Sequence, residues 1–103
     1  LRHLYDGTLL SATSTEYFMT LLEQQTLNYA LPTGLDGGVS FAHKTGALDN
    51  ISHDAGVLGY GDREMIVVMM TDGWTAAYDQ SPARFAEFGA LLSTYIKTTH
   101  EGA

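Results

Sequence analysis

Three consecutive residues, Lys44, Thr45 and Gly46, carry the most recognisable chemistry in this sequence. The loose alternation of apolar and polar residues before them predicts a strand from Val39 to Thr45, so the triplet stands at the end of that strand. On an edge strand it would place a cation and a hydroxyl on one side of a cleft, and the glycine would let a ligand approach the backbone. These groups suit a substrate with a carboxylate and an extended amide backbone.

Two helices are predicted before this strand. Leu1 to Gly7 reads as the last turns of a helix, with glycine as the left-handed cap. Thr13 and Glu16 form a capping-box pattern that predicts a second helix, with Thr13 as its N-cap, running to about Gln25. Helical spacing gives that helix one apolar face, which consists of Tyr17, Phe18, Leu21 and Leu22.

Two further strands are predicted after the triplet. A turn within residues 47–52 leads into a strand from about His53 to Leu58, and a tight reversal at 60–63 leads into a third strand over 64–71. Short connections between three strands indicate an antiparallel meander.

A closing helix is predicted to start with Ser81 as its N-cap and Pro82 in its first position. Small residues on it would allow a close approach to a sheet: Ala86, Gly89 and Ala90. Its apolar stripe consists of Phe85, Phe88, Leu91, Leu92, Tyr95 and Ile96. The fold class is therefore α+β, a three-stranded antiparallel meander covered by helices.

The third strand is apolar at every position from Met65 to Met70, so both of its faces should be covered, as in the middle of a sheet. Its evident partner in this chain is the preceding strand, and its other edge should therefore be open. We expect another strand to pair there, from a second chain, a symmetry mate or a missing part of the same protein.

Composition limits the classes of partner. The 103 residues are 45% hydrophobic and 17% charged, which fits one globular domain or a piece of one. A net charge of −7 with five basic residues excludes nucleic acid and an anionic membrane surface as main partners. The absence of cysteine excludes disulfides, zinc-cysteine sites and a thiol nucleophile. We also expect no metal site from the spacing of His3, His43, His53 and His100.

Several motifs follow one another in a fixed order: 31–34, 43–48, 53–57 and the apolar strand that ends in Thr71-Asp72. With this order the chain resembles the C-terminal part of the class A β-lactamase-related serine hydrolases, within the serine β-lactamase and penicillin-binding protein superfamily. The resemblance covers nearly the whole chain, including the upstream and closing helices. It implies that the meander is part of a larger β-lactamase/transpeptidase-like sheet, extended along the third strand.

The resemblance implies acyl transfer to a serine nucleophile, from a β-lactam, a D-amino-acid peptide or an ester, followed by hydrolysis and without a cofactor. Lys44 would place positive charge near the nucleophile and the substrate carboxylate, and Thr45 would hydrogen-bond that carboxylate. The backbone N–H of Ala47 would be one oxyanion-hole donor. Gly46 would clear space for the substrate. Export from the cytoplasm is implied by the resemblance alone.

The nucleophile itself is not in this sequence. None of the serines has a lysine three residues later, and no Ser-Asp-Asn occurs. Glu23 reads as a solvated helix residue rather than a deacylation residue. By the order of motifs in the family, we expect residues 1–103 to be a single C-terminal portion. Its partner would be the N-terminal portion of the same protein or a second chain.

An alternative remains from the residues alone: a non-catalytic binding or assembly module that captures a strand along the third strand's open edge. The Lys44 triplet would then be incidental, with Lys44 a solvated strand lysine. A swapped homo-oligomer is a further possibility.

The sequence also predicts places for residues outside the triplet. The side chain of His43 should lie on the face of the strand opposite Lys44, where it is either packed in the interior or exposed to solvent. His53 and Asp54 should form a hydrogen-bonded structural pair. Two aromatic residues should cover the sheet, Trp74 and Tyr78.

Overall fold

The computed structural model describes residues 1–98, apart from the side chain of Tyr78, so the predictions for that side chain and for His100 lie outside the described part. The elements are α1 (Arg2–Asp6), α2 (Ala12–Glu23), a 3-10 turn η1 (Leu31–Gly34), β1 (Ser40–Leu48), β2 (Ile51–Tyr60), β3 (Arg63–Thr71) and α3 (Ala77–Thr98). The predicted α+β class and the order of elements are confirmed.

The sheet is an antiparallel meander in the order β1-β2-β3. Both connections are two-residue turns, at Asp49-Asn50 and at Gly61-Asp62, and Gly61 has the positive φ of 62° that the second turn needs. Because the first turn is shorter than predicted, β1 continues through the triplet to Leu48, and Thr45 lies opposite Asp54.

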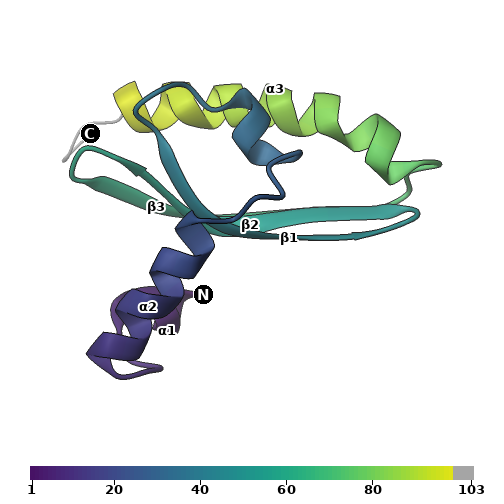
Figure 1. Cartoon of the computed structure of the whole chain (residues 1–103). Helices are drawn as coiled ribbons and strands as arrows, with labels where there is room; N and C mark the ends of the chain where they lie inside the picture. Colours follow the sequence, from purple (N-terminus) through teal and green to yellow (C-terminus); the bar gives the residue numbers. More distant parts are fainter. Residues whose placement is uncertain (99–103) are drawn as a thin grey trace.

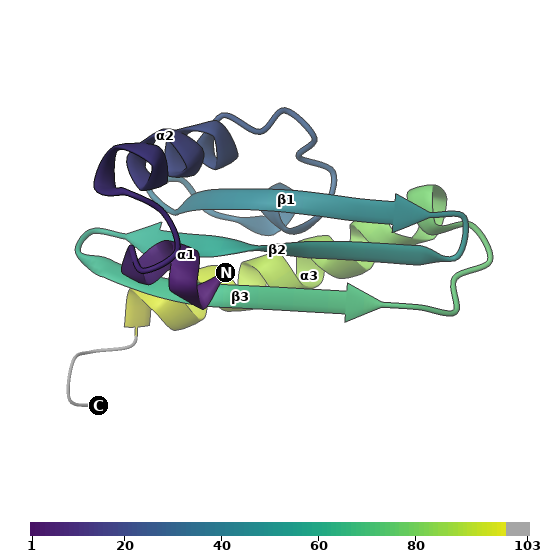
Figure 2. The ribbon, with the colours of Figure 1, turned by 90° about the horizontal axis from the view of Figure 1, so that it is seen from below.

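Helices cover the two faces of the sheet unequally. Figures 1 and 2 show α3 along one face and α1 and α2 on the other, towards one end of the sheet. We call the face under α3 the inner face and the opposite one the outer face. The core lies on the inner face and consists of Ala30, Leu31, Phe41, Leu58, Val67, Phe85 and Ile96.

The glycines of α3 and η1 let these two elements come into backbone contact. A Cβ on Gly34 would lie 1.9 Å from the carbonyl oxygen of Ala86, and one on Gly89 would lie 2.4 Å from that of Leu31. The small residues of α3 therefore serve the approach to η1, rather than the approach to the sheet that the sequence suggested.

Both main helices begin earlier than predicted. Ser11, not Thr13, is the N-cap of α2, because its Oγ accepts a hydrogen bond from the backbone N–H of Ser14 at 3.1 Å. The helix ends at Glu23, which is exposed, as expected. Serine 81 does not cap α3, since the helix already begins at Ala77.

The start of α3 is stabilised by the side chain of Gln80, whose Oε1 accepts hydrogen bonds from the backbone N–H groups of Thr75 and Ala76, both at 3.0 Å. Ser81 is instead buried, and its hydroxyl donates to the Oγ of Ser52 at 3.2 Å. Pro82 consequently lies within the helix, in its second turn.

Large apolar side chains remain exposed at several places in the described chain. On the outer face of the sheet, Leu48, Val68 and Met70 form what we call the uncovered patch, with Val68 55% and Met70 74% exposed. Thus β3 is not covered on both faces by this chain, and its outer edge pairs with no strand among the described residues. Other exposed apolar side chains lie on α2, at Tyr17, Phe18 and Leu21, on α3, at Phe88, Leu91 and Tyr95, and outside these elements, at Leu1, Tyr5, Leu9, Leu10 and Leu27. None of the described helices has the length and hydrophobicity needed to cross a membrane.

Candidate functional site

Lys44 lies on the outer face of β1, the first edge strand of the sheet, and its side chain is exposed. Its Nζ donates a hydrogen bond to the carbonyl oxygen of Thr45 at 2.8 Å. The ammonium group therefore lies against the backbone of the strand, within reach of a molecule that approaches from the outer face.

Thr45 lies on the inner face and is only 6% exposed. Consecutive strand residues point to opposite faces, so the cation and the hydroxyl do not lie on one side of a cleft, as the sequence had suggested. The two side chains instead lie on opposite faces of the same edge strand. A ligand that contacts both must lie along the edge.

Gly46 and Ala47 complete the end of the triplet. A Cβ on Gly46 would meet no atom within 4 Å, so the space beside this residue is open. In an antiparallel strand the N–H and C=O of alternate residues point to the same side. The N–H of Ala47 therefore points to the same side of β1 as the Thr45 carbonyl that Lys44 contacts.

His43 is buried on the inner face and bonded through both ring nitrogens. Its Nδ1 lies 2.8 Å from Oδ1 of Asp54, with side chains 2% and 0% exposed respectively. Its Nε2 lies 2.9 Å from Oδ1 of Asn28. The other carboxylate oxygen of Asp54, Oδ2, accepts a hydrogen bond from the backbone N–H of Leu31 at 3.1 Å.

The expected pair of His53 and Asp54 is therefore wrong, and Asp54 pairs with His43 across the two strands. The physical reason is again alternation, since neighbours in β2 leave the sheet on opposite faces. The prediction that His43 points away from Lys44 is correct. The pair could have been found from the register between β1 and β2. A two-residue turn at Asp49-Asn50 makes His43 and Asp54 diagonal neighbours on one face of the sheet.

Two neighbours shape the place that His43 occupies. Its ring stacks on Phe41, with centroids 4.9 Å apart and planes 9° from parallel. Gly56 lies directly opposite in the register, where a Cβ would come within 2.8 Å of the Cα and Cβ of His43. The glycine thus permits the close approach of the two strands at this point.

His53 lies on the outer face, as Lys44 does, and directly opposite Gly46. Its Nδ1 accepts a hydrogen bond from the backbone N–H of Thr71 at 3.1 Å. The neutral ring therefore carries its proton on Nε2.

The serines nearest the triplet form a buried structural cluster. Ser52 and Ser81 are bonded to each other, and the hydroxyl of Thr71 donates to the carbonyl of Ser52. Trp74 is half-buried beside them and donates from Nε1 to the Thr71 hydroxyl at 2.6 Å. These hydroxyls are hydrogen-bonded to one another's residues and to Trp74.

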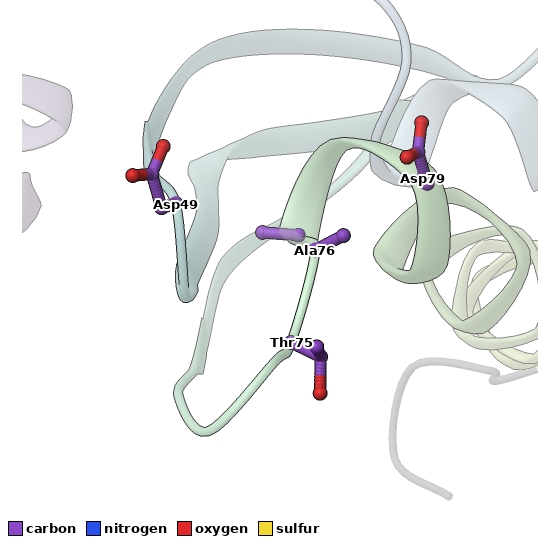
Figure 3. A pocket seen from close by; sticks show the side chains of 5 residues that line it. Asp49, Thr75, Ala76 and Asp79 are labelled. Carbon is purple, nitrogen blue, oxygen red and sulfur yellow. The ribbon is translucent and has the colours of Figure 1, made fainter.

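A pocket of about 290 Å³ lies at the start of α3, beside the β1–β2 turn. Figure 3 shows Asp49 and Asp79 on two sides of Ala76, while Thr75 points away. The residues that line it include none of 44–47: Asp49, Thr75, Ala76, Ala77 and Asp79. Within residues 1–98 no group of three or more histidine, aspartate or glutamate side chains could hold a metal ion.

The family model described as the β-lactamase enzyme family matches residues 1–96. The chain belongs to this family. Among curated proteins, none matches the sequence. The β-lactamase family is therefore assigned from the family model, and the resemblance inferred from the Lys44 triplet and its neighbouring motifs is confirmed at this level.

Solved structures show the same fold at low sequence identity. The structure of PBP-A has a TM-score of 0.82 and 21% identity, over 94% of this chain and 37% of that one. A mutant of PBP-A, solved as an acyl-enzyme complex with penicillin G, has a TM-score of 0.81 and 21% identity, over 93% and 36%. The β-lactamase from Sphaerobacter thermophilus DSM 20745 has a TM-score of 0.78 and 16% identity, over 96% and 38%. This β-lactamase-family chain thus spans just over a third of the length of these structures.

Proposed function

We propose that the full-length protein is a serine hydrolase that forms an acyl-enzyme with a β-lactam, a D-amino-acid peptide or an ester. This chain would supply β1 as one side of the active site. The observation that carries the proposal is the Lys44 triplet on an open edge strand, with the ammonium group against the strand backbone and free space beside Gly46. Membership of the β-lactamase family supports it.

Each group of the strand would have a separate task. Lys44 would attract the substrate carboxylate and lower the free energy of negative charge near the nucleophile. The Ala47 N–H would donate to the oxyanion of the tetrahedral intermediate, a kind of contact typically worth about 3–4 kcal/mol. Thr45 lies on the other face of the strand, so its hydroxyl would reach a carboxylate only at the edge itself.

The uncovered patch indicates where the nucleophile would come from. Val68 lies in the same row of the outer face as Lys44, across Ala55, and Met70 lies in the next row, across His53 from Gly46. An apolar patch of this kind requires a covering segment in the folded protein. The segment that covers it would therefore lie beside Lys44, and we propose that it carries the serine and its lysine.

That covering segment would belong to the N-terminal portion of the same protein or to a second chain. The share of the solved structures that this chain spans supports the former, because more than half of each has no counterpart here. A strand from the same portion would pair along β3 and satisfy its open edge.

The test is covalent labelling of the full-length protein with a fluorescent penicillin and with a fluorophosphonate. Labelling of one serine is expected, and Lys44→Ala should slow acylation by the penicillin. Arg84→Ala is a matched control, since it also removes an exposed cation, whose Glu87 partner is equally exposed. Equal acylation rates for Lys44→Ala and wild type would show that Lys44 has no role in acylation.

The open edge of β3 favours one second candidate, a non-catalytic module that captures a strand from a partner. The same labelling separates the two functions. A full-length protein that is folded and takes up neither probe would support the module.

A further inference from the structure

We propose that His43 is a positioning residue for the Lys44 strand, acting as a doubly protonated imidazolium between Asp54 and Asn28. In this role it connects three segments: β1, β2 and the stretch 25–31 that follows α2. The effect on Lys44 rests on the proposed function, whereas the charge state of the ring does not.

The first step concerns the protons of the ring. Asn28 donates from Nδ2 to the backbone carbonyl of Gln25 at 3.0 Å, and this contact fixes which end of its amide faces His43. The end that faces the ring is therefore the oxygen, an acceptor. The Oδ1 of an ionised Asp54 is likewise an acceptor, so both ring nitrogens would donate, and only the imidazolium has two N–H groups.

The second step concerns charge balance in the interior. Asp54 is fully buried, and its one neutral donor is the backbone N–H of Leu31. A buried carboxylate is costly unless it is paired with a cation and hydrogen-bonded. In the proposed state the ring of His43 would supply that cation, with its Nδ1 2.8 Å from Oδ1 of Asp54.

The third step concerns the strand. As an edge strand, β1 has ladder hydrogen bonds on one side only, which leaves it less constrained than a central strand. His43 is the residue immediately before Lys44, and its ring is contacted by Phe41, Asp54 and Asn28. With His43 held on the inner face, the backbone must direct Lys44 to the outer face.

The first experiment is nitrogen NMR of the His43 ring in the full-length protein at neutral pH. We expect both ring nitrogens to resonate as protonated, with a coupled proton on each. A spectrum in which either nitrogen is unprotonated would overturn the proposal. This result does not depend on whether the protein forms an acyl-enzyme.

The second experiment measures the acylation rate constant and the binding constant of a penicillin separately, for Asn28→Ala and His43→Gln. Asn28→Ala leaves the buried pair and its hydrogen bond from the Leu31 N–H in place, and removes the contacts of the Asn28 side chain with His43 and Gln25. A small displacement of a catalytic group can reduce a rate about 10- to 100-fold. We expect a fall of about tenfold in the acylation rate constant for Asn28→Ala, a larger one for His43→Gln, and little change in penicillin binding.

The matched control is Thr26→Ala, an exposed position in the same segment whose truncation leaves both contacts of His43 in place. Its acylation rate constant should equal that of the wild type. If Asn28→Ala and His43→Gln both have a lower melting temperature but the same acylation rate constant as the wild type, the network is only structural and the positioning role is overturned. If the wild-type protein does not acylate at all, the proposed function fails while the NMR result still decides the charge state.

Discussion

His43 and Asp54 lie on adjacent strands and form a hydrogen-bonded pair that is almost completely removed from solvent, with 2.8 Å between Nδ1 and Oδ1. The pair is located on the inner face of the sheet, directly behind the strand that presents Lys44 on the outer face. The edge strand therefore carries two different chemistries, a buried polar network on one face and an exposed cation on the other. The buried network therefore lies one residue before Lys44 on the same edge strand.

Removal of one partner of this pair should be strongly destabilising. In Asp54→Ala, His43 would be left as an unpaired buried cation, and we expect a loss of about 3–5 kcal/mol in the free energy of unfolding. Denaturant unfolding of the full-length protein measures it. Asp36→Ala is the control, because it breaks an exposed ion pair with Lys97 and should cost about 1 kcal/mol or less. Similar losses in the two variants would contradict the burial of the His43–Asp54 pair.

Two glycines on the strands should respond differently to alanine. In Gly56→Ala the new Cβ would lie 2.1 Å from the carbonyl oxygen of Ala42, so the strands must separate and stability should fall by about 1–3 kcal/mol or more. In Gly46→Ala the methyl group meets open space, and stability should change by less than about 1 kcal/mol. The same methyl group should slow acylation if a substrate lies along β1. Thermal unfolding and acylation kinetics together test this, and an unstable Gly46→Ala protein would refute it.

The contact between α1 and β3 should weaken at high pH. The hydroxyl of Tyr5 donates to Oε1 of Glu64 at 2.8 Å, and this hydrogen bond raises the pKa of Tyr5 above its ordinary value of 10.0. Because the folded-state pKa is the higher one, the contribution to stability is complete below pH 10.0 and disappears as the pH rises through the folded-state pKa.

Hydrogen exchange of the α1 amides as a function of pH measures this effect, after correction for the intrinsic exchange rate. Tyr5→Phe is the reference, since it lacks the hydroxyl at every pH. The difference in protection between wild type and Tyr5→Phe should vanish on the alkaline side. A constant difference across that range would show that the hydrogen bond does not hold α1 on the sheet.

The uncovered patch should be an interior surface of the full-length protein. Met70→Lys places a charge on it, so we expect a marked loss of stability in the full-length protein and improved solubility of residues 1–103 expressed alone. Thr13→Lys, at an exposed polar position of α2, should have neither effect. Light scattering and thermal unfolding provide the comparison. A wild-type 1–103 chain that is monomeric and monodisperse would indicate that the patch needs no cover.

The sequence was sufficient for the number and order of the elements, because glycine turns and apolar periodicity are local signals. The predicted start of α3 at Ser81 was wrong, because the helix begins at Ala77 and the side chain of Gln80 binds the backbone N–H groups before it. The wrong partner for Asp54 has a different origin, since the predicted turn over 47–52 was too long to fix the register between β1 and β2. Once the turn is known to be Asp49-Asn50, the contact between His43 and Asp54 follows from the pairing alone.

For the candidate site, the sequence located the Lys44 triplet but not the arrangement of its side chains. From the sequence, the triplet on an edge strand predicts the cation of Lys44 and the hydroxyl of Thr45 on one side of a cleft. Because β1 continues to Leu48, strand geometry separates them. The contribution of Asn28 could not be predicted, since it depends on the path of an irregular segment.

The most direct test of the central claim is intact-protein mass spectrometry of the full-length protein during incubation with penicillin G. We expect the wild-type protein to gain the mass of one penicillin, Lys44→Ala to gain it more slowly, and Arg84→Ala to match the wild type. No mass gain in folded wild-type protein, or equal rates of gain in Lys44→Ala and wild type, would contradict the assignment of β1 as one side of an acyl-enzyme site.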